Sequence, residues 1–426
     1  MPNLPTTLPH RAVFMLLLLA VLFGGATRQP NWGFFGHQRI NRMAVFTLPP
    51  EMIGFYKKNI EYITEHAVDP DKRRYAVKLE APRHFIDADH WGKAPFADLP
   101  RYWTDALARY TDVYVVTANN DTLLLLGNKT MRTDKKTLTL RSPALKRLFG
   151  KDSLTLDKLA YRKFFSTHIE SQYYETDWVI NPDTLLTLFA NNPPKKTMQW
   201  RAAFAKDRFS EFGIVPYHLE YMQRRLTAAF KEGDAAKILR LSAEIGHYVG
   251  DAHVPLHTTE NYNGQFSNQI GIHGFWESRL PELFADTEYD FFVGKADYIP
   301  SMHNFVWQTV TDSHALLDTV LNTERELVKK FPEDKQMCYE QRADLNVLLQ
   351  CKEFSRAWHT RMNGMVEARM RAAIKAVGDV WYTAWIDAGQ PDLNALSLTK
   401  DQKAEKAEQE TLENASKNSE MIGRKE

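Results

Sequence analysis

The sequence has few cysteines and no excess of charge of one sign. Only Cys338 and Cys351 occur among 426 residues, and neither is placed to ligate a metal. In an exported protein the pair favours a disulfide that closes a short loop, with two free thiols as the alternative. Lys plus Arg (54) nearly cancel Asp plus Glu (53). This balance excludes a global electrostatic preference for nucleic acid or anionic membranes, while local patches stay open.

Long hydrophobic runs are also lacking, apart from one near the N-terminus. Arg11 precedes the apolar run 12–23, and Gly24-Gly25-Ala26 follows it. The run is shorter than the roughly 20 residues that a membrane-spanning helix needs. We therefore predict a secretory signal peptide over residues 1–26, with an uncleaved anchor as the alternative. No cysteine lies at the signal exit, which disfavours a lipoprotein. The expected destination of the exported chain is the periplasm or the exterior.

Helical periodicity dominates the rest of the chain. Apolar residues make up 44% of the sequence, which is enough for a sizeable core. The spacing of these residues predicts a mainly α fold. The predicted helices are 37–46, 51–64, 167–190, 214–231, 235–250, 297–330 and 354–388.

Two regions depart from this pattern. Residues 113–117 and 123–126 are rich in β-forming side chains and flank Asn119-Asn120-Asp121, which predicts a hairpin. Residues 137–140 add a further candidate strand. We assign the region of about 105–165 as a small β-hairpin insertion. Residues 399–426 are charged and lack aromatics, so we predict a disordered charged tail there.

Histidines and carboxylates recur at helical spacing in residues 244–277. His247 and Asp251 are four residues apart, and His273 and Glu277 repeat this spacing. On a helix such a pair shares one face. Pro255 ends the first helix before His257. Imidazole and carboxylate groups are the ligands that zinc accepts, so this stretch predicts a zinc site. A single histidine on a helix is more often structural, but two such pairs with a histidine between them favour a metal.

The motifs of this stretch and of three others resemble one superfamily. They read WGFFGH at 32–37, Asp69 followed by HFIDA at 84–88, HYVGDAHVPLH at 247–257, and HGFWE at 273–277. Together they are similar to the superfamily of bacterial zinc-dependent phospholipase C and the secreted single-strand-preferring zinc nucleases. The resemblance spans 32–280, and the insertion within it matches no part of the family.

The resemblance implies a single multi-helix phospholipase C/nuclease-like domain over 32–395 that holds up to three zinc ions. The implied ligands are Asp69, His84, His247 and Asp251 for one ion, the bridging Asp251 with His37 and Trp32 for a second, and His257, His273 and Glu277 for a third.

The resemblance also implies roles for neighbouring side chains. Asp87 would orient or deprotonate the attacking water, with Asp89 as the alternative for that role. Asp251 would serve catalysis as the bridge between two ions. His253 lies inside the motif, but we expect it to be structural and not a ligand. His90 and Arg74 are candidate phosphate contacts.

Two departures from the family leave the substrate open. The family's first ligand is a mature N-terminal tryptophan, yet cleavage after Ala26 would leave five residues ahead of Trp32. Glu277 is the phospholipase-like last ligand, where the nucleases have Asp, whereas the step from Trp32 to His37 is nuclease-like.

The expected function is an exported zinc-dependent phosphodiester hydrolase that acts on phospholipid or single-stranded nucleic acid. Transient membrane contact fits the lipid alternative, and no obligate protein partner is expected. A non-catalytic zinc-stabilised binding protein is the alternative class. Candidate lipid contacts are Phe34, Phe35 and Leu123 to Leu126; candidate nucleic-acid contacts are Trp91, Arg101, Tyr102 and Trp103; core packing is the competing interpretation of both sets.

Overall fold

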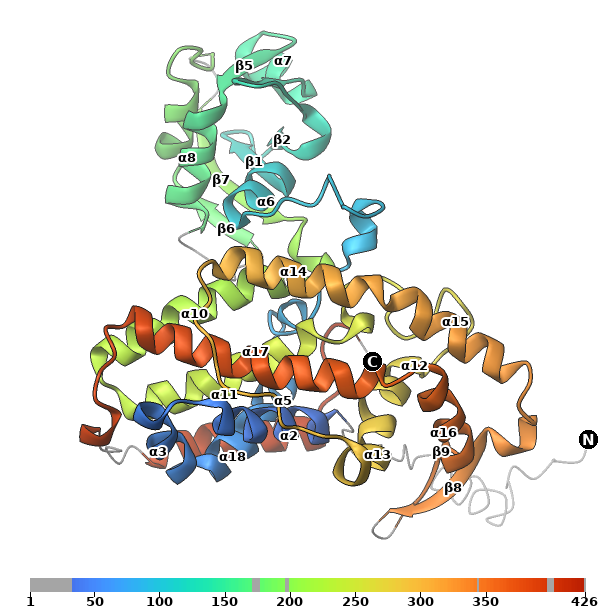
Figure 1. Ribbon diagram of the computed structural model, residues 1–426. Helices are drawn as coiled ribbons and strands as arrows, with labels where there is room; N and C mark the ends of the chain where they lie inside the picture. The colour runs from blue at the N-terminus through green and yellow to red at the C-terminus, as the bar shows by residue number, and fades with distance from the viewer. Residues whose placement is uncertain (1–32, 171–176, 196–198, 343–344, 397–401, 425–426) are drawn as a thin grey trace, which may run out of the picture.

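The computed structural model describes residues 33–170, 177–195, 199–342, 345–396 and 402–424. The fold is mainly helical and carries small antiparallel sheets, as predicted (Figure 1). The predicted signal peptide and Trp32 lie outside the described residues. Within the described residues, no helix combines the length and the apolar character needed to cross a membrane.

The helical body is built from N-terminal and C-terminal parts of the chain. Its helices are α2 (Phe34–Ala44), α3 (Pro50–Lys58), α4 (Ile60–Glu65), α5 (Asp69–Arg73), α10 (Val215–Glu232), α11 (Ala235–Ala252), α12 (Ile272–Gly274), α13 (Leu280–Glu288), α14 (Met302–Ala315), α15 (Leu317–Val328), α16 (Lys352–Arg361), α17 (Met365–Asp387) and α18 (Gln402–Asn418).

Helix α11 lies at the centre of this body and packs against α2, α10 and α17. Fifteen of its eighteen residues are buried, so helices cover it on nearly every side. The predicted helix 354–388 is divided into α16 and α17. Asn363 and Gly364 interrupt it with positive φ angles of 49° and 75°. The stripe of Trp358, Met362, Val366 and Met370 is buried in the core.

An α/β unit projects from the body above α14 (Figure 1). Its strands form a four-stranded sheet, in the order β2-β1-β7-β6, and a three-stranded sheet, β3-β4-β5. The unit comprises α6 (Trp103–Tyr110), β1 (Thr111–Thr117), β2 (Thr122–Leu126), β3 (Met131–Thr133), β4 (Thr137–Leu140), α7 (Pro143–Phe149), β5 (Leu154–Asp157), α8 (Lys158–His168), β6 (Asp177–Ile180), α9 (Pro182–Leu186) and β7 (Trp200–Asp207).

The predicted hairpin is present as β1 and β2, but the inserted unit is larger than expected. It continues to Asp207, and the predicted helix 167–190 is wrong for much of its length. In that range α8 ends and β6 pairs with β7, placing Trp178 opposite Ala205 and Ile180 opposite Ala203. Both side chains are buried in a hydrophobic core that is separate from the core of the body. Long-range strand pairing therefore overrides the local helical spacing.

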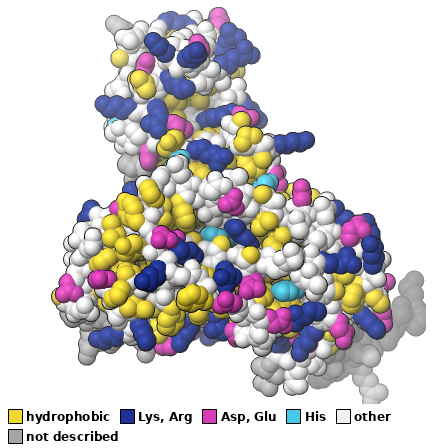
Figure 2. Space-filling model, in the orientation of Figure 1, with side chains coloured by type: hydrophobic (Ala, Val, Ile, Leu, Met, Phe, Trp, Pro, Cys, Tyr) yellow, Lys and Arg dark blue, Asp and Glu magenta, His cyan; other side chains and the backbone are white. Residues whose placement is uncertain are grey.

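Two C-terminal features bear on the predictions: the predicted disulfide is present and closes a hairpin that was not predicted, and the predicted disordered tail is helical. The hairpin of β8 (Met337–Arg342) and β9 (Leu345–Gln350) is closed by a disulfide between Cys338 and Cys351. This bond is consistent with an oxidising, extracellular compartment. The predicted disordered tail is instead helical in α18, which packs on α5. Figure 2 shows charges of both signs interspersed over one face of the molecule, in keeping with the balanced composition.

Candidate metal centre

The centre is organised by α11 and its contact with α2. His247 and Asp251 lie one turn apart on α11 and are almost fully buried. Two glycines on the same helix allow α2 to approach. A Cβ on Gly246 would lie 2.0 Å from Asn41 Oδ1, and a Cβ on Gly250 would lie 2.9 Å from His37 Nδ1. Only glycine permits this separation, which brings the predicted ligand His37 against Asp251.

The first group of ligand atoms surrounds Asp251 Oδ2. His84 Nδ1 lies 3.0 Å from this oxygen, His247 Nε2 lies 3.3 Å from it, and the two nitrogens are 3.1 Å apart. Asp71 Oδ1 completes the group at 3.7 Å from His84 and 3.6 Å from His247. A tetrahedral zinc with bonds of about 2.1 Å separates its ligand atoms by roughly 3.4 Å. These four side chains therefore have the spacing of a tetrahedral site.

The carboxylate in this group is Asp71, whereas the predicted ligand was Asp69. Asp69 Oδ2 instead lies 2.5 Å from His66 Nδ1, and its Oδ1 lies 3.4 Å from Lys72 Nζ. The reason is that residues 69–73 form a helix, α5. Residues two apart on a helix point in different directions, so only one of the two carboxylates can face α11. A sequence signal for Asp71 exists in Arg74, three residues on, whose Nη1 lies 3.8 Å from Asp71.

A second group joins His257, His273 and Glu277, the set that the family resemblance implied. The two Nε2 atoms are 3.2 Å apart, and Glu277 Oε2 lies 3.2 Å from His257 and 2.7 Å from His273. A π-helical turn over Phe275–Arg279 follows α12 and carries Glu277. All three side chains are buried or nearly so.

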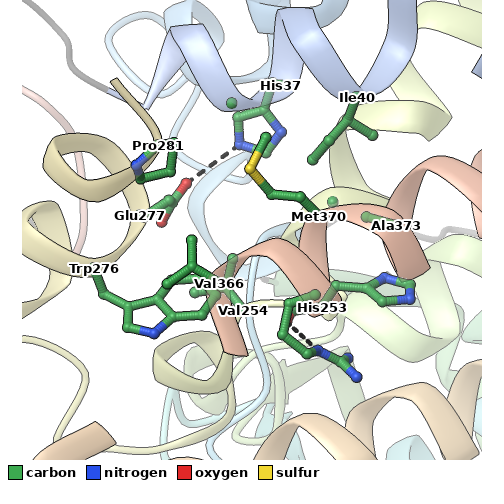
Figure 3. Close-up of a pocket in the computed structure, with 13 residues that line it drawn as sticks. His37, Ile40, His253, Val254, Trp276, Glu277, Pro281, Val366, Met370 and Ala373 are labelled. Atoms are coloured by element: carbon green, nitrogen blue, oxygen red, sulfur yellow. Dashed lines mark hydrogen bonds and ion pairs between the residues drawn. The ribbon is translucent and has the colours of Figure 1, made fainter. Parts of the chain in front are cut away.

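His37 links the two groups. Its Nε2 lies 3.4 Å from Asp251 Oδ1 and 3.4 Å from Glu277 Oε1. Figure 3 shows Glu277 pointing toward His37 beside a small cavity of about 30 Å³ with largely apolar walls, including Trp276, Pro281 and Met370. The predicted ligands therefore converge, except Asp69 and Trp32, the latter lying outside the described residues.

Hydrogen bonding fixes which ring nitrogens face the centre. The Nδ1 atoms of His247, His257 and His273 lie 2.8, 2.7 and 3.2 Å from the backbone carbonyls of Ala67, His84 and Tyr262. A carbonyl only accepts, so each Nδ1 is the donor and each neutral ring turns an Nε2 lone pair inward. This is how proteins orient histidines that bind metals.

Asp251 provides an independent test of the fit. Its side chain is 1% exposed, and neither carboxylate oxygen receives a hydrogen bond from any described residue. A buried carboxylate without donors is costly unless a cation compensates it. Lone pairs from histidine Nε2 atoms and carboxylate oxygens thus converge on the same space. The residues present fit zinc ions, which accept this combination of nitrogen and oxygen ligands.

The pKa values of His84 and Glu277 are shifted in directions that favour positive charge on the histidine and negative charge on the carboxylate. Burial lowers the pKa of His84, yet its contacts with Asp251 and Glu80 raise the pKa to about 9. Burial raises the pKa of Glu277, but the adjacent rings of His257, His273 and His37 hold it well below its usual value. Glu80 is itself buried between Tyr248, Arg73 and Arg83, and its Oε1 lies 3.7 Å from His84 Nε2. Glu80 thus orients His84 from outside the centre.

His253 and Asp89 have structural contacts. The His253 ring donates through Nδ1 to the carbonyl of Val249 at 2.7 Å, and the His253 carbonyl accepts from Arg369. It does not join the ligand groups, in agreement with its predicted role. Asp89 accepts from the Thr259 hydroxyl and the Glu260 amide and so ties two loops together.

A cleft of about 610 Å³ lies beside the centre. Its walls come from the body, from the inserted unit and from the C-terminal segment. Asp87 is on the wall, and burial raises its pKa to about 6 although Arg424 lowers it. The sequence did not single out the other polar wall residues Lys206, Arg208 and Arg424. Their positions depend on how distant segments pack, and no local pattern marks them.

Three of the candidate substrate contacts are core residues, and the others are half-buried or exposed. Leu125 and Leu126 are fully buried in the inserted unit, and Trp91 is 8% exposed. The predicted phosphate contact His90 bonds Glu260 at 2.9 Å and stacks on Phe212. The remaining candidates have mixed positions: Phe34 and Phe35 are half-buried, Tyr102 stacks on His303, Arg101 lies over Trp307, and Trp103 lines the cleft.

The chain was compared with protein-family models and with curated proteins. No protein-family model matches the chain, and no curated protein matches it.

Proposed function

We propose that the chain is an exported zinc-dependent phosphodiester hydrolase of the trinuclear zinc phospholipase C/nuclease superfamily. The observation that carries the proposal is the convergence of five buried histidines and three carboxylates on one small volume. The converging residues are His37, Asp71, His84, His247, Asp251, His257, His273 and Glu277.

When bound, zinc would lower the pKa of a coordinated water towards neutrality and offset the negative charge of a phosphodiester. The side chains around the centre supply the rest. Asp87, on the cleft wall, would accept a proton from the attacking water or orient it. Arg74, next to Asp71, would donate to a phosphate oxygen.

The walls of the cleft carry charges of both signs and aromatic side chains, and the basic ones suit an anionic substrate with an apolar part. Lys206 and Arg208 line it together with Phe85, Trp178 and other aromatic side chains. Basic groups attract a phosphodiester, and aromatic surfaces accept either bases or acyl chains. Phospholipid and single-stranded nucleic acid both fit this description.

Export is part of the proposal. The N-terminal run predicts a signal peptide, and the disulfide of the β8-β9 hairpin supports an oxidising destination, periplasmic or extracellular.

The test begins with the metal. Zinc per chain is measured by mass spectrometry on the purified protein, and turnover of bis-nitrophenyl phosphate is followed with and without a chelator. We expect two to three zinc ions per chain, as set by the ligand groups, and hydrolysis that the chelator abolishes. Zinc without turnover would instead favour the non-catalytic binding protein. Parallel assays on phosphatidylcholine and single-stranded DNA then assign the substrate class.

A further inference from the structure

The C-terminal segment reaches the cleft from the far side of the body. Helix α18 packs on α5, where Leu412 is buried and Arg240 makes two hydrogen bonds to Glu408 of 3.0 and 2.8 Å. The chain then continues to the cleft, where Ile422, Gly423 and Arg424 form part of the lining. Figure 1 places the C-terminal end over the middle of the body, near α12.

Arg424 is held like a bound ligand. Its Nη1 donates to Asp87 Oδ1 at 2.7 Å, and its Nη2 donates to the carbonyl of Thr259 at 2.8 Å. The guanidinium lies over the rings of Phe85 and Tyr262, with its carbon 4.0 and 3.7 Å from their centroids. The side chain is only 7% exposed. A carboxylate, a carbonyl and two aromatic faces together form a close fit for a planar cation.

The backbone of the segment also binds Arg74, a buried side chain behind the cleft lining. Arg74 Nη2 donates to the Arg424 carbonyl at 2.5 Å, and the Ile422 amide donates to the Arg74 carbonyl at 2.9 Å. Arg74 is 1% exposed and adjoins Asp71 of the first ligand group. The segment therefore engages both Asp87 and Arg74, the two side chains that would act on a phosphodiester.

We propose that residues 402–424 form an intramolecular inhibitor, in which α18 is the anchor and Arg424 is the plug of the substrate cleft. This inference rests on the proposed hydrolase function, because it assigns Asp87 and Arg74 to the substrate. A phosphodiester reaches these groups only when the plug leaves, so the intact chain has lower activity than its centre can support. Any condition that detaches the segment would raise activity, because it increases the population of chains with an open cleft.

The first test uses the full chain with single substitutions. Arg424→Ala removes the hydrogen bonds to Asp87 and Thr259, and Arg424→Glu adds repulsion from Asp87. We expect both to raise kcat/KM for bis-nitrophenyl phosphate about tenfold, since hydrogen bonds to charged groups stabilise the closed state by that order. Lys417→Ala is the matched control, because Lys417 is exposed on the same segment and pairs with Glu413. Unchanged or lower rates in both Arg424 variants, with zinc retained, would overturn the proposal.

The second test separates the plug from the hydrolase function. A fluorescein-labelled peptide of residues 402–426 is titrated into the full chain that carries Arg424→Glu, whose own segment is repelled by Asp87, and anisotropy reports binding. We expect saturable binding that an Arg424→Ala peptide weakens about tenfold. Peptide binding without turnover by any chain would retain the plug and reject the hydrolase. Turnover without peptide binding would reject the plug and retain the hydrolase.

Discussion

The Nε2 atoms of His257 and His273 lie 3.2 Å apart, and the Nδ1–H group of each ring donates a hydrogen bond to a backbone carbonyl. Two lone pairs at this distance repel each other unless a cation lies between them. Glu277 brings a carboxylate oxygen to the same point. The backbone thus enforces an arrangement that is stable only with positive charge, and this relationship leads to the first prediction.

Zinc removal should destabilise the fold. The ligands come from α2, α5, α11 and the segments around His84 and His273, so the metal joins elements that are distant in sequence. Binding that is specific for the folded state adds to its stability. We expect a chelator to lower the melting temperature by about 10 °C and added zinc to restore it, as followed by calorimetry. Magnesium serves as the control and should not restore it.

Substitution of Asp71 and Asp69 distinguishes the two candidate carboxylates. Asp71→Asn should lower zinc content and reduce kcat/KM at least about 100-fold, because it removes an anionic ligand. Asp69→Asn should keep the zinc and lose only the contacts to His66 and Lys72, at about 1–2 kcal/mol of stability. Metal analysis of both variants checks the pair. Loss of zinc from the Asp69→Asn variant but not from the Asp71→Asn variant would identify Asp69 as the ligand.

Asp251 and His253 form a second matched pair, two residues apart in the same motif. Asp251→Asn should abolish activity and release zinc, because its two oxygens face different ligand groups. His253→Ala should leave the zinc content unchanged and lower stability by about 2–4 kcal/mol through the lost packing and hydrogen bond. Zinc content and denaturant unfolding measure the two effects. Full activity in both variants would show that the centre is misassigned.

Activity should fall in acid with a midpoint near the pKa of Asp87. Burial raises this pKa to about 6 although contact with Arg424 lowers it, so departure of Arg424 places the midpoint at about 6 or higher. Only the ionised carboxylate can accept a proton from water. Below that pH, kcat/KM should drop about tenfold per pH unit. The profile is measured from pH 4.5 to 8 with zinc content determined at each point, which separates Asp87 from loss of metal. A flat profile across this range with zinc retained would contradict the assigned role.

Loss of the disulfide should destabilise the chain without affecting the centre. Replacing the pair by Cys338→Ser and Cys351→Ala opens a loop between residues 13 apart in sequence. Bridges of this size stabilise by about 3 kcal/mol. Urea unfolding should show this loss, whereas zinc content and kcat/KM stay unchanged. Reduced wild-type protein is the control and should match the variant.

The ligand groups could be predicted from sequence where the spacing itself defines a helical face. The pairs of His247 with Asp251 and of His273 with Glu277 needed only the four-residue spacing. Asp71 was missed because Asp69 and Asp71 have the same side chain. Only the orientation of α5 against α11 determines which of the two faces the ligand group. The choice between them is a property of tertiary packing.

The inserted unit and the C-terminal segment show the limits of local patterns. Residues 177–180 are a strand because β7, more than twenty residues on, pairs with them. The charged composition of α18 predicts disorder, but contacts to Arg240 and α5 hold the segment on the body. In both cases the partner is remote, so no window of sequence contains the information.

The inserted unit has a hydrophobic core of its own, whereas every described ligand belongs to the helical body. Its Trp178 and Lys206 nevertheless form part of the cleft wall. In the proposed hydrolase, metal chemistry and choice of substrate would therefore belong to parts of the chain that fold around different cores. Variation in the unit can change which substrate the cleft accepts while the geometry of the metal ligands stays intact. Proteins that carry a different unit at this position would then share one reaction and differ in substrate.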